Sequence, residues 1–132
     1  MPRTGTACLL VLAATALAGC GGGGGGGGGK AVTVRPGVPL AFTAKEYKFN
    51  PGKVTVDAGG KQVPLTIKLH NNGSLGHDLV VEKGGQEVGG TDVITNGKDA
   101  TTTVRLAPSD YTFVCTVGDH AQLGMKGTLT VK

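Results

Sequence analysis

Residues 111–131 read YTFVCTVGDHAQLGMKGTLTV, and the prediction of the fold starts from this stretch. Its ends, YTFV and GTLTV, are rich in the β-branched and aromatic residues that favour strands. The loop between them contains Cys115, His120 and Met125, with four residues separating each from the next. Two adjacent strands can hold the ends of such a loop rigidly. The stretch therefore predicts a fixed loop that presents a thiol, an imidazole and a thioether together.

Strand-like patterns recur along the rest of the chain. In residues 63–73, VPLTIKLHNNG, apolar side chains occupy every second position, and residues 53–60, KVTVDAGG, alternate in the same way. No segment places apolar residues at helical spacing over ten or more positions. The sequence therefore predicts an all-β domain of about seven or eight strands in two sheets.

Turn signals divide these strands. Residues 38–49, VPLAFTAKEYKF, form one candidate strand, which ends at the Asn-Pro-Gly turn signal of residues 50–52. Residues 82–98, EKGGQEVGGTDVITNGK, are polar and rich in glycine. We expect this last segment to be a loop.

The N-terminus is expected to target the protein out of the cytoplasm, with residues 1–19 as a signal peptide. A basic residue precedes an apolar stretch from Ala7 to Ala18, which is too short to span a membrane and typical of a signal peptide. Leu-Ala-Gly-Cys at 17–20 resembles a bacterial lipobox. The resemblance implies that Cys20 is lipidated and anchors the mature protein to a bacterial membrane. The alternative is ordinary secretion, with Cys20 an unmodified thiol.

Residues 20–30 are expected to form a flexible tether ahead of a folded domain at 31–132. The tether includes nine consecutive glycines and would span about 20 Å as a random coil. Cys115 is the only cysteine after Cys20, so the folded domain cannot form an internal disulfide. Export normally favours disulfide pairing, and a lone exported thiol therefore points to a bound metal.

The charge of the chain argues against a nucleic-acid partner. Without Arg3, which lies in the expected signal peptide, 12 Lys and Arg face 9 Asp and Glu, a net charge of +3. The basic residues are scattered and form no run, whereas nucleic-acid binding usually needs a basic stripe.

The candidate metal ligands in the expected domain are few: His70, His77, Cys115, His120 and Met125. One thiolate, two imidazoles and a weak axial thioether suit a copper site for electron transfer. The first imidazole must come from His70 or His77. Alternation places His70 opposite the apolar face of its strand, whereas His77 follows a glycine-rich turn. We favour His77 as the ligand.

Residues 46–81 and 111–131 together resemble the cupredoxins, the type 1 blue copper proteins, and the resemblance runs from about Phe42 to Val131. The Cys–His spacing is similar to that of azurin, the His–Met spacing to that of plastocyanin, and the mixed loop to that of auracyanin. The resemblance implies a Greek-key β-sandwich that binds one type 1 copper ion. It also implies a ligand set, namely His77, Cys115, His120 and Met125.

Three neighbours of these ligands gain roles from the same resemblance. Gly76 precedes His77 as a glycine does in azurin, so its carbonyl is a candidate weak axial ligand. Asp78 stands where many members have Asn, and it could accept the hydrogen bonds that tie the two ligand loops. Asp119 replaces part of a Pro-Gly pair and could affect loop order or docking.

As a cupredoxin, the protein would be a monomeric electron carrier outside the cytoplasm, and it would not be an enzyme. Its partners would be redox proteins such as cytochromes, an oxidase or a reductase. The main alternative is copper storage or delivery by the same fold. A cysteine enzyme, with Cys115 as nucleophile and His120 as base, is disfavoured because the sequence shows no sign of an oxyanion loop. A structural zinc site is disfavoured because such sites use more thiolates or histidines and no methionine.

Overall fold

The computed structural model describes residues 30–132, which form ten strands and no helix. The strands are β1 (Ala31–Val34), β2 (Leu40–Lys45), β3 (Lys48–Asn50), β4 (Lys53–Val56), β5 (Val63–Asn71), β6 (Val80–Lys83), β7 (Gln86–Gly90), β8 (Asp99–Leu106), β9 (Ser109–Val114) and β10 (Lys126–Val131). The expected signal peptide, Cys20 and almost all of the expected tether lie outside the described residues.

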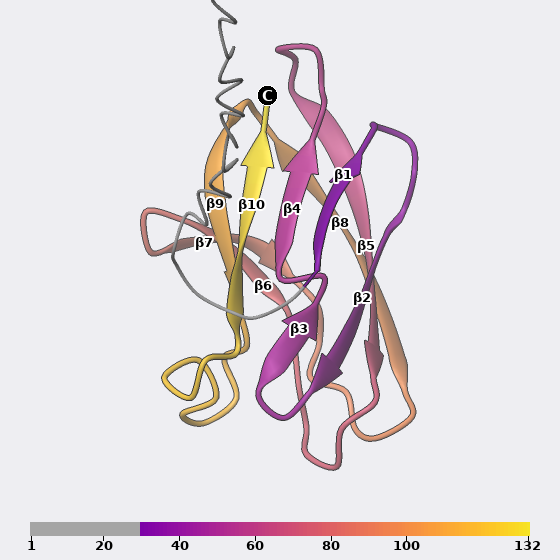
Figure 1. Cartoon of the computed structure of the whole chain (residues 1–132), viewed down its shortest axis with the longest axis vertical. Helices are drawn as coiled ribbons and strands as arrows, with labels where there is room; N and C mark the ends of the chain where they lie inside the picture. Colours follow the sequence, from indigo (N-terminus) through magenta and orange to yellow (C-terminus); the bar gives the residue numbers. More distant parts are fainter. Residues whose placement is uncertain (1–29) are drawn as a thin grey trace, which may run out of the picture.

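The strands form two facing sheets (Figure 1). The larger sheet has the order β1-β4-β10-β9-β6-β7, and the smaller has the order β3-β2-β5-β8. Strand β4 lies parallel to both β1 and β10, and β2 lies parallel to β5. This arrangement confirms the predicted all-β sandwich, with more strands than the seven or eight expected.

Side-chain alternation decides which face of each strand is buried. Every second residue of β5 is buried, from Val63 to Asn71, and β2 has the same two-residue period. A strand directs successive side chains to opposite faces, so these buried rows meet between the sheets. The alternation read from the sequence therefore corresponds to the packed interior.

Part of the segment predicted to be a loop is a strand. Residues 86–90 form β7, an edge strand that pairs with β6 in antiparallel register, Lys83 opposite Gln86. Gly84 and Gly85 connect them with φ of 56° and 78°, values suited to a two-residue hairpin turn. Strand β7 has few apolar residues because it lies at the sheet edge, and this hid it in the sequence pattern.

The single strand predicted over residues 38–49 is divided in two. A turn at Glu46 and Tyr47 separates β2 from β3, which pair as an antiparallel hairpin. The turn contains no glycine, proline or asparagine, so no turn signal marks it in the sequence. This hairpin turn lies at the end of the sandwich that also presents the loops after β5 and β9, the lower end in Figure 1.

Three phenylalanine rings fill the centre of the sandwich. The ring of Phe113 lies 4.9 Å from that of Phe42 and 5.5 Å from that of Phe49, both in edge-to-face contact. On β10, a Cβ at Gly127 would lie 2.5 Å from Cε2 of Phe113. Glycine at this position therefore gives the Phe113 ring room over the backbone.

Within residues 30–132, no helix is long and apolar enough to cross a membrane.

Replacing Phe113 with alanine should lower the free energy of unfolding by about 3–5 kcal/mol, because it removes the shared partner of two aromatic contacts. Urea unfolding at equal metal content measures the change. Thr112→Ala is the control, since Thr112 is exposed on the same strand and should change the free energy by less than about 0.5 kcal/mol. A loss below about 1 kcal/mol for Phe113→Ala would contradict the described core.

Candidate metal centre

Three buried side chains converge at one end of the sandwich: His77, Cys115 and His120. One ligand atom of each lies within 4.8 Å of the others, and their exposed fractions are 0%, 1% and 6%. Sγ of Cys115 is 3.8 Å from Nδ1 of His77 and 3.5 Å from Nδ1 of His120. Both imidazoles therefore turn the same ring nitrogen toward the one sulfur.

Backbone hydrogen bonds fold the loop after β9 into a closed turn. The N–H of Cys115 donates to the carbonyl of Met125 over 3.0 Å, and the N–H of Met125 donates to the carbonyl of His120 over 3.0 Å. The positive φ of 50° at Gly118 suits glycine and helps reverse the chain. These bonds bring residues that are distant along the loop back beside Cys115.

His77 is held by a short backbone bridge to Ile94. Its N–H donates to the carbonyl of Ile94 over 3.0 Å, and the N–H of Ile94 donates back over 2.8 Å. The buried amide of Asn71 donates to the carbonyls of Ile94 and Leu75, at 2.7 and 2.8 Å. His77 therefore lies three residues before β6, in an isolated bridge outside the sheet ladder.

Asp78 joins the two segments that contain the cluster. Its carboxylate accepts a hydrogen bond from the N–H of Thr116 over 2.7 Å and a second from the Thr116 hydroxyl. Asp78 is almost fully buried and follows His77, while Thr116 follows Cys115. The carboxylate therefore fixes the spacing between His77 and Cys115.

Sequence reasoning missed a residue that contacts His77 directly. Oε1 of Glu46 accepts hydrogen bonds from the N–H of Leu75 over 2.7 Å and from Nε2 of His77 over 3.1 Å. The hydrogen bond from Leu75 is the main cause that lowers the pKa of Glu46 from 4.5 to about 2, and the bond from His77 acts in the same direction. The residue next to Glu46, Tyr47, packs its ring edgewise on His120 at 5.0 Å. No sequence signal marks the contacts of Glu46 and Tyr47 with the two imidazoles, because these contacts exist only once the fold places the β2–β3 turn beside the cluster.

The other predicted site residues lie at different distances from the cluster. Met125 is fully buried at the end of the ligand loop. Gly76 is partly exposed beside His77, and Asp119 is exposed beside His120. His70 is outside the cluster: it faces away from the core, its side chain is 42% exposed, and its Nδ1 lies 2.8 Å from Asp99 on β8. Cys20 is outside the described residues.

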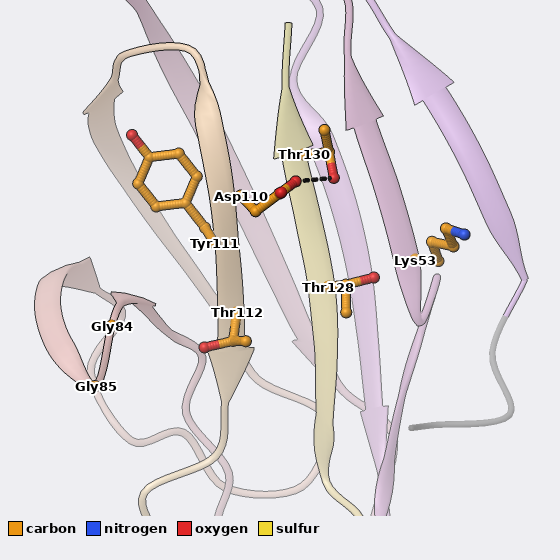
Figure 2. Close-up of a pocket in the computed structure, with 8 residues that line it drawn as sticks. All are labelled: Lys53, Gly84, Gly85, Asp110, Tyr111, Thr112, Thr128 and Thr130. Atoms are coloured by element: carbon orange, nitrogen blue, oxygen red, sulfur yellow. Dashed lines mark hydrogen bonds between the residues drawn. The ribbon is translucent and has the colours of Figure 1, made fainter. Parts of the chain in front are cut away.

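A separate groove of about 430 Å³ lies on the outer face of the larger sheet and contains none of these residues (Figure 2). Its lining includes Lys53 and Asp110, and the Asp110 carboxylate accepts a hydrogen bond from the Thr130 hydroxyl over 2.8 Å. No buried side-chain nitrogen or oxygen in residues 30–132 lacks a hydrogen-bond partner, so the groove offers no unpaired buried polar group to a ligand.

The family model of the copper-binding proteins of the plastocyanin/azurin family matches residues 37–132, which is most of the chain. The chain belongs to this family. A search of curated proteins found no matching relative.

Solved structures of two auracyanins and a rusticyanin share the fold of this family member. The reduced auracyanin of Roseiflexus castenholzii has a TM-score of 0.65 at 21% identity, with 74% of this chain and 98% of that chain covered. Auracyanin A of Chloroflexus aurantiacus has a TM-score of 0.62 at 22% identity, covering 78% of this chain and all of the other. Reduced rusticyanin has a TM-score of 0.61 at 22% identity, covering 77% and 84%.

The chemistry of the cluster fits a type 1 copper site. Its donors are one thiol and two imidazoles, which suit copper, and no carboxylate belongs to the cluster within the described residues. Burial is the main cause that raises the pKa of the Cys115 thiol. A cysteine nucleophile and a cysteine metal ligand both act as the thiolate, so a metal bound at this site would have to displace the thiol proton.

Asp78→Ala should lower the free energy of unfolding by about 1.5–3 kcal/mol, because it removes a buried charged acceptor from the N–H and the hydroxyl of Thr116. Urea unfolding of the metal-free protein measures this loss without a contribution from metal affinity. The control is Asp57→Ala, which removes an exposed carboxylate. Equal effects of the two substitutions would show that Asp78 does not join the two segments.

Proposed function

We propose that this family member is a type 1 blue copper protein that carries single electrons between redox partners outside the cytoplasm. The observation behind the proposal is the buried cluster in which two imidazole nitrogens face one cysteine sulfur. Members of the family are electron carriers, and the chemistry of this donor set agrees with that role.

In this proposal His77, Cys115 and His120 would hold the copper ion, and Met125 would supply a thioether as a weaker ligand. Copper bound there supplies one-electron chemistry by alternating between Cu(II) and Cu(I). The residues of the chain fix the donors in place: Asp78 joins the two segments, and the backbone bond between Cys115 and Met125 closes the loop. A site with rigid donors changes little between the two oxidation states, which is what an electron carrier needs. The carbonyl of Gly76 is a second candidate for a weak contact with the metal.

The edge of His120 is the proposed point of contact with redox partners. Every buried side-chain nitrogen in residues 30–132 has a hydrogen-bond partner, whereas Nε2 of His120 has none. This nitrogen therefore lies at the surface, although the rest of the side chain is buried. Leu123, in the same loop, is 51% exposed. Small or apolar neighbours and a buried imidazole with one edge at the surface suit brief encounters that bury less than about 1,200 Å². Asp119, exposed beside His120, would influence which partners dock. Cytochromes, an oxidase or a reductase are the proposed classes of partner.

The proposed location is the outer side of a bacterial cytoplasmic membrane or the periplasm. In this proposal residues 1–19 are removed, Cys20 is lipidated, and residues 20–30 tether the monomeric domain at 31–132. The lipobox-like sequence and the glycine run support this part of the proposal. A tether would let the domain turn and reach partners in the same membrane.

The copper-loaded protein should absorb red light strongly through charge transfer from the Cys115 thiolate to Cu(II), and Cys115→Ser should abolish the band. His77→Ala should also abolish the band, whereas His70→Ala should leave it unchanged because His70 lies outside the cluster. A visible spectrum of each variant at equal copper content measures this. A colourless protein that binds only Cu(I) would contradict electron transfer and favour copper storage or delivery. Loss of the band in His70→Ala alone would overturn the choice of His77.

Cys20→Ser should move the protein from the membrane fraction to the soluble fraction, because lipid on Cys20 is the proposed anchor. Immunoblots of fractionated cells that express the full chain measure the distribution. Cys8→Ser is the matched control, because Cys8 lies within the expected signal peptide and should leave membrane attachment intact. Membrane attachment that survives Cys20→Ser would contradict the anchor.

A further inference from the structure

We propose that Glu46 is a positioning residue for His77. Glu46 sets the tautomer of the His77 imidazole and lowers the reduction potential of the site. The proposal rests on the proposed function, because a reduction potential presupposes copper at the cluster. It concerns a residue of the β2–β3 turn that lies outside the ligand set.

The first argument is the geometry around the His77 ring. Nε2 lies 3.1 Å from Oε1 of Glu46, while Nδ1 faces Sγ of Cys115 at 3.8 Å. An ionised carboxylate only accepts hydrogen bonds, so Nε2 must carry the hydrogen. Nδ1 is then the unprotonated nitrogen, and its lone pair is directed toward the sulfur. Glu46 therefore selects the tautomer in which His77 can bind a metal on the side of Cys115.

The second argument is that the backbone leaves room for this carboxylate. A Cβ at Gly73 would lie 2.8 Å from both Cδ and Oε2 of Glu46. Real Cβ atoms do not approach other atoms so closely, so any larger residue at position 73 would displace the carboxylate. Gly73 is fixed in turn, because its N–H donates to Oδ1 of Asn71 over 2.8 Å. The loop after β5 therefore leaves space for the Glu46 carboxylate at Gly73.

The third argument is electrostatic. Glu46 has a side chain that is only 22% exposed, and it is hydrogen-bonded to an imidazole that is fully buried. A carboxylate that accepts the distal N–H of a metal-binding histidine makes the imidazole a stronger donor. Such a donor, with a nearby negative charge, stabilises Cu(II) more than Cu(I) because Cu(II) carries the larger charge. The expected consequence is a lower reduction potential.

The two imidazoles of the cluster thus differ in their surroundings. In residues 30–132 the histidine–carboxylate pairs are His77 with Glu46 and the distant His70 with Asp99, so His120 has no carboxylate partner. Its neighbour from the same turn is the ring of Tyr47. The β2–β3 turn therefore contacts both imidazoles. It places a carboxylate at the buried His77 and an aromatic ring at His120, whose edge reaches the surface.

A purely structural role for Glu46 is the competing explanation, since Oε1 also accepts the N–H of Leu75 and could simply secure the loop. That role predicts a lower melting temperature on substitution and an unchanged potential. The electronic role predicts a changed potential whether or not the melting temperature moves.

The test is the reduction potential of the full copper-loaded chain, compared with that of Glu46→Gln. Removing the charge should change the ratio of Cu(II) to Cu(I) affinity about tenfold, which raises the potential by about 59 mV for one electron. Glu87→Gln is the matched control, because it removes the same charge from the exposed edge strand β7 and should leave the potential unchanged. Gly73→Ala should raise the potential as Glu46→Gln does, since it displaces the carboxylate without removing it. Potentials in the Glu46 and Gly73 variants that differ from wild type no more than that of Glu87→Gln would overturn the electronic effect.

A second readout tests the positioning alone. In the NMR spectrum of the Cu(I)-loaded protein, the Nε2–H proton of His77 should exchange slowly with water, and Glu46→Ala should make it exchange rapidly. An unchanged proton signal in Glu46→Ala would overturn the positioning role. This measurement needs only Cu(I), so it still tests Glu46 if the protein is colourless and the proposed electron transfer fails. A blue protein with equal potentials would instead contradict only the electronic effect of Glu46.

Discussion

The hydrogen bonds from Thr116 to the carboxylate of Asp78 join the two parts of the chain on which the metal centre depends. Asp78 and Thr116 are 38 residues apart in sequence, yet each directly follows a member of the cluster, His77 or Cys115. A buried carboxylate that lost these donors would be left unsatisfied, so the pairing is strongly favoured once the sheets form. The sandwich brings β6 and β9 side by side, and this bond converts their pairing into a fixed distance between an imidazole and a thiol.

Around that link, the centre uses three loops from one end of the sandwich. The loop after β9 contributes Cys115 and His120, the loop after β5 contributes His77, and the β2–β3 turn packs against both imidazoles. Each loop is closed by its own backbone or amide hydrogen bonds, so the donors are held before any metal arrives. Such preorganisation suits a centre that must keep one arrangement in two oxidation states, and it would hinder a protein that must release its metal.

Most of the candidate centre could be predicted because its signals are local. Cys115, His120 and Met125 lie in one loop, and strand alternation separated His70, which faces outward, from His77. Glu46 could not be predicted, because it reaches His77 across 31 residues of chain through a turn that carries no turn-forming residue. The fold class followed from two-residue alternation, whereas β7 was missed because an edge strand buries too few side chains to alternate. The contact between Glu46 and His77 depends on tertiary arrangement alone.

The most direct test of the central claim is X-ray absorption at the copper edge of the loaded protein, recorded in both oxidation states. The account predicts one thiolate sulfur and two imidazole nitrogens as the near neighbours of copper, with almost the same shell in Cu(II) and Cu(I). Loss of the sulfur in Cys115→Ser should remove that contribution alone. A shell without sulfur, or a shell that loses ligands on reduction, would contradict the account and indicate a protein that binds copper in order to release it.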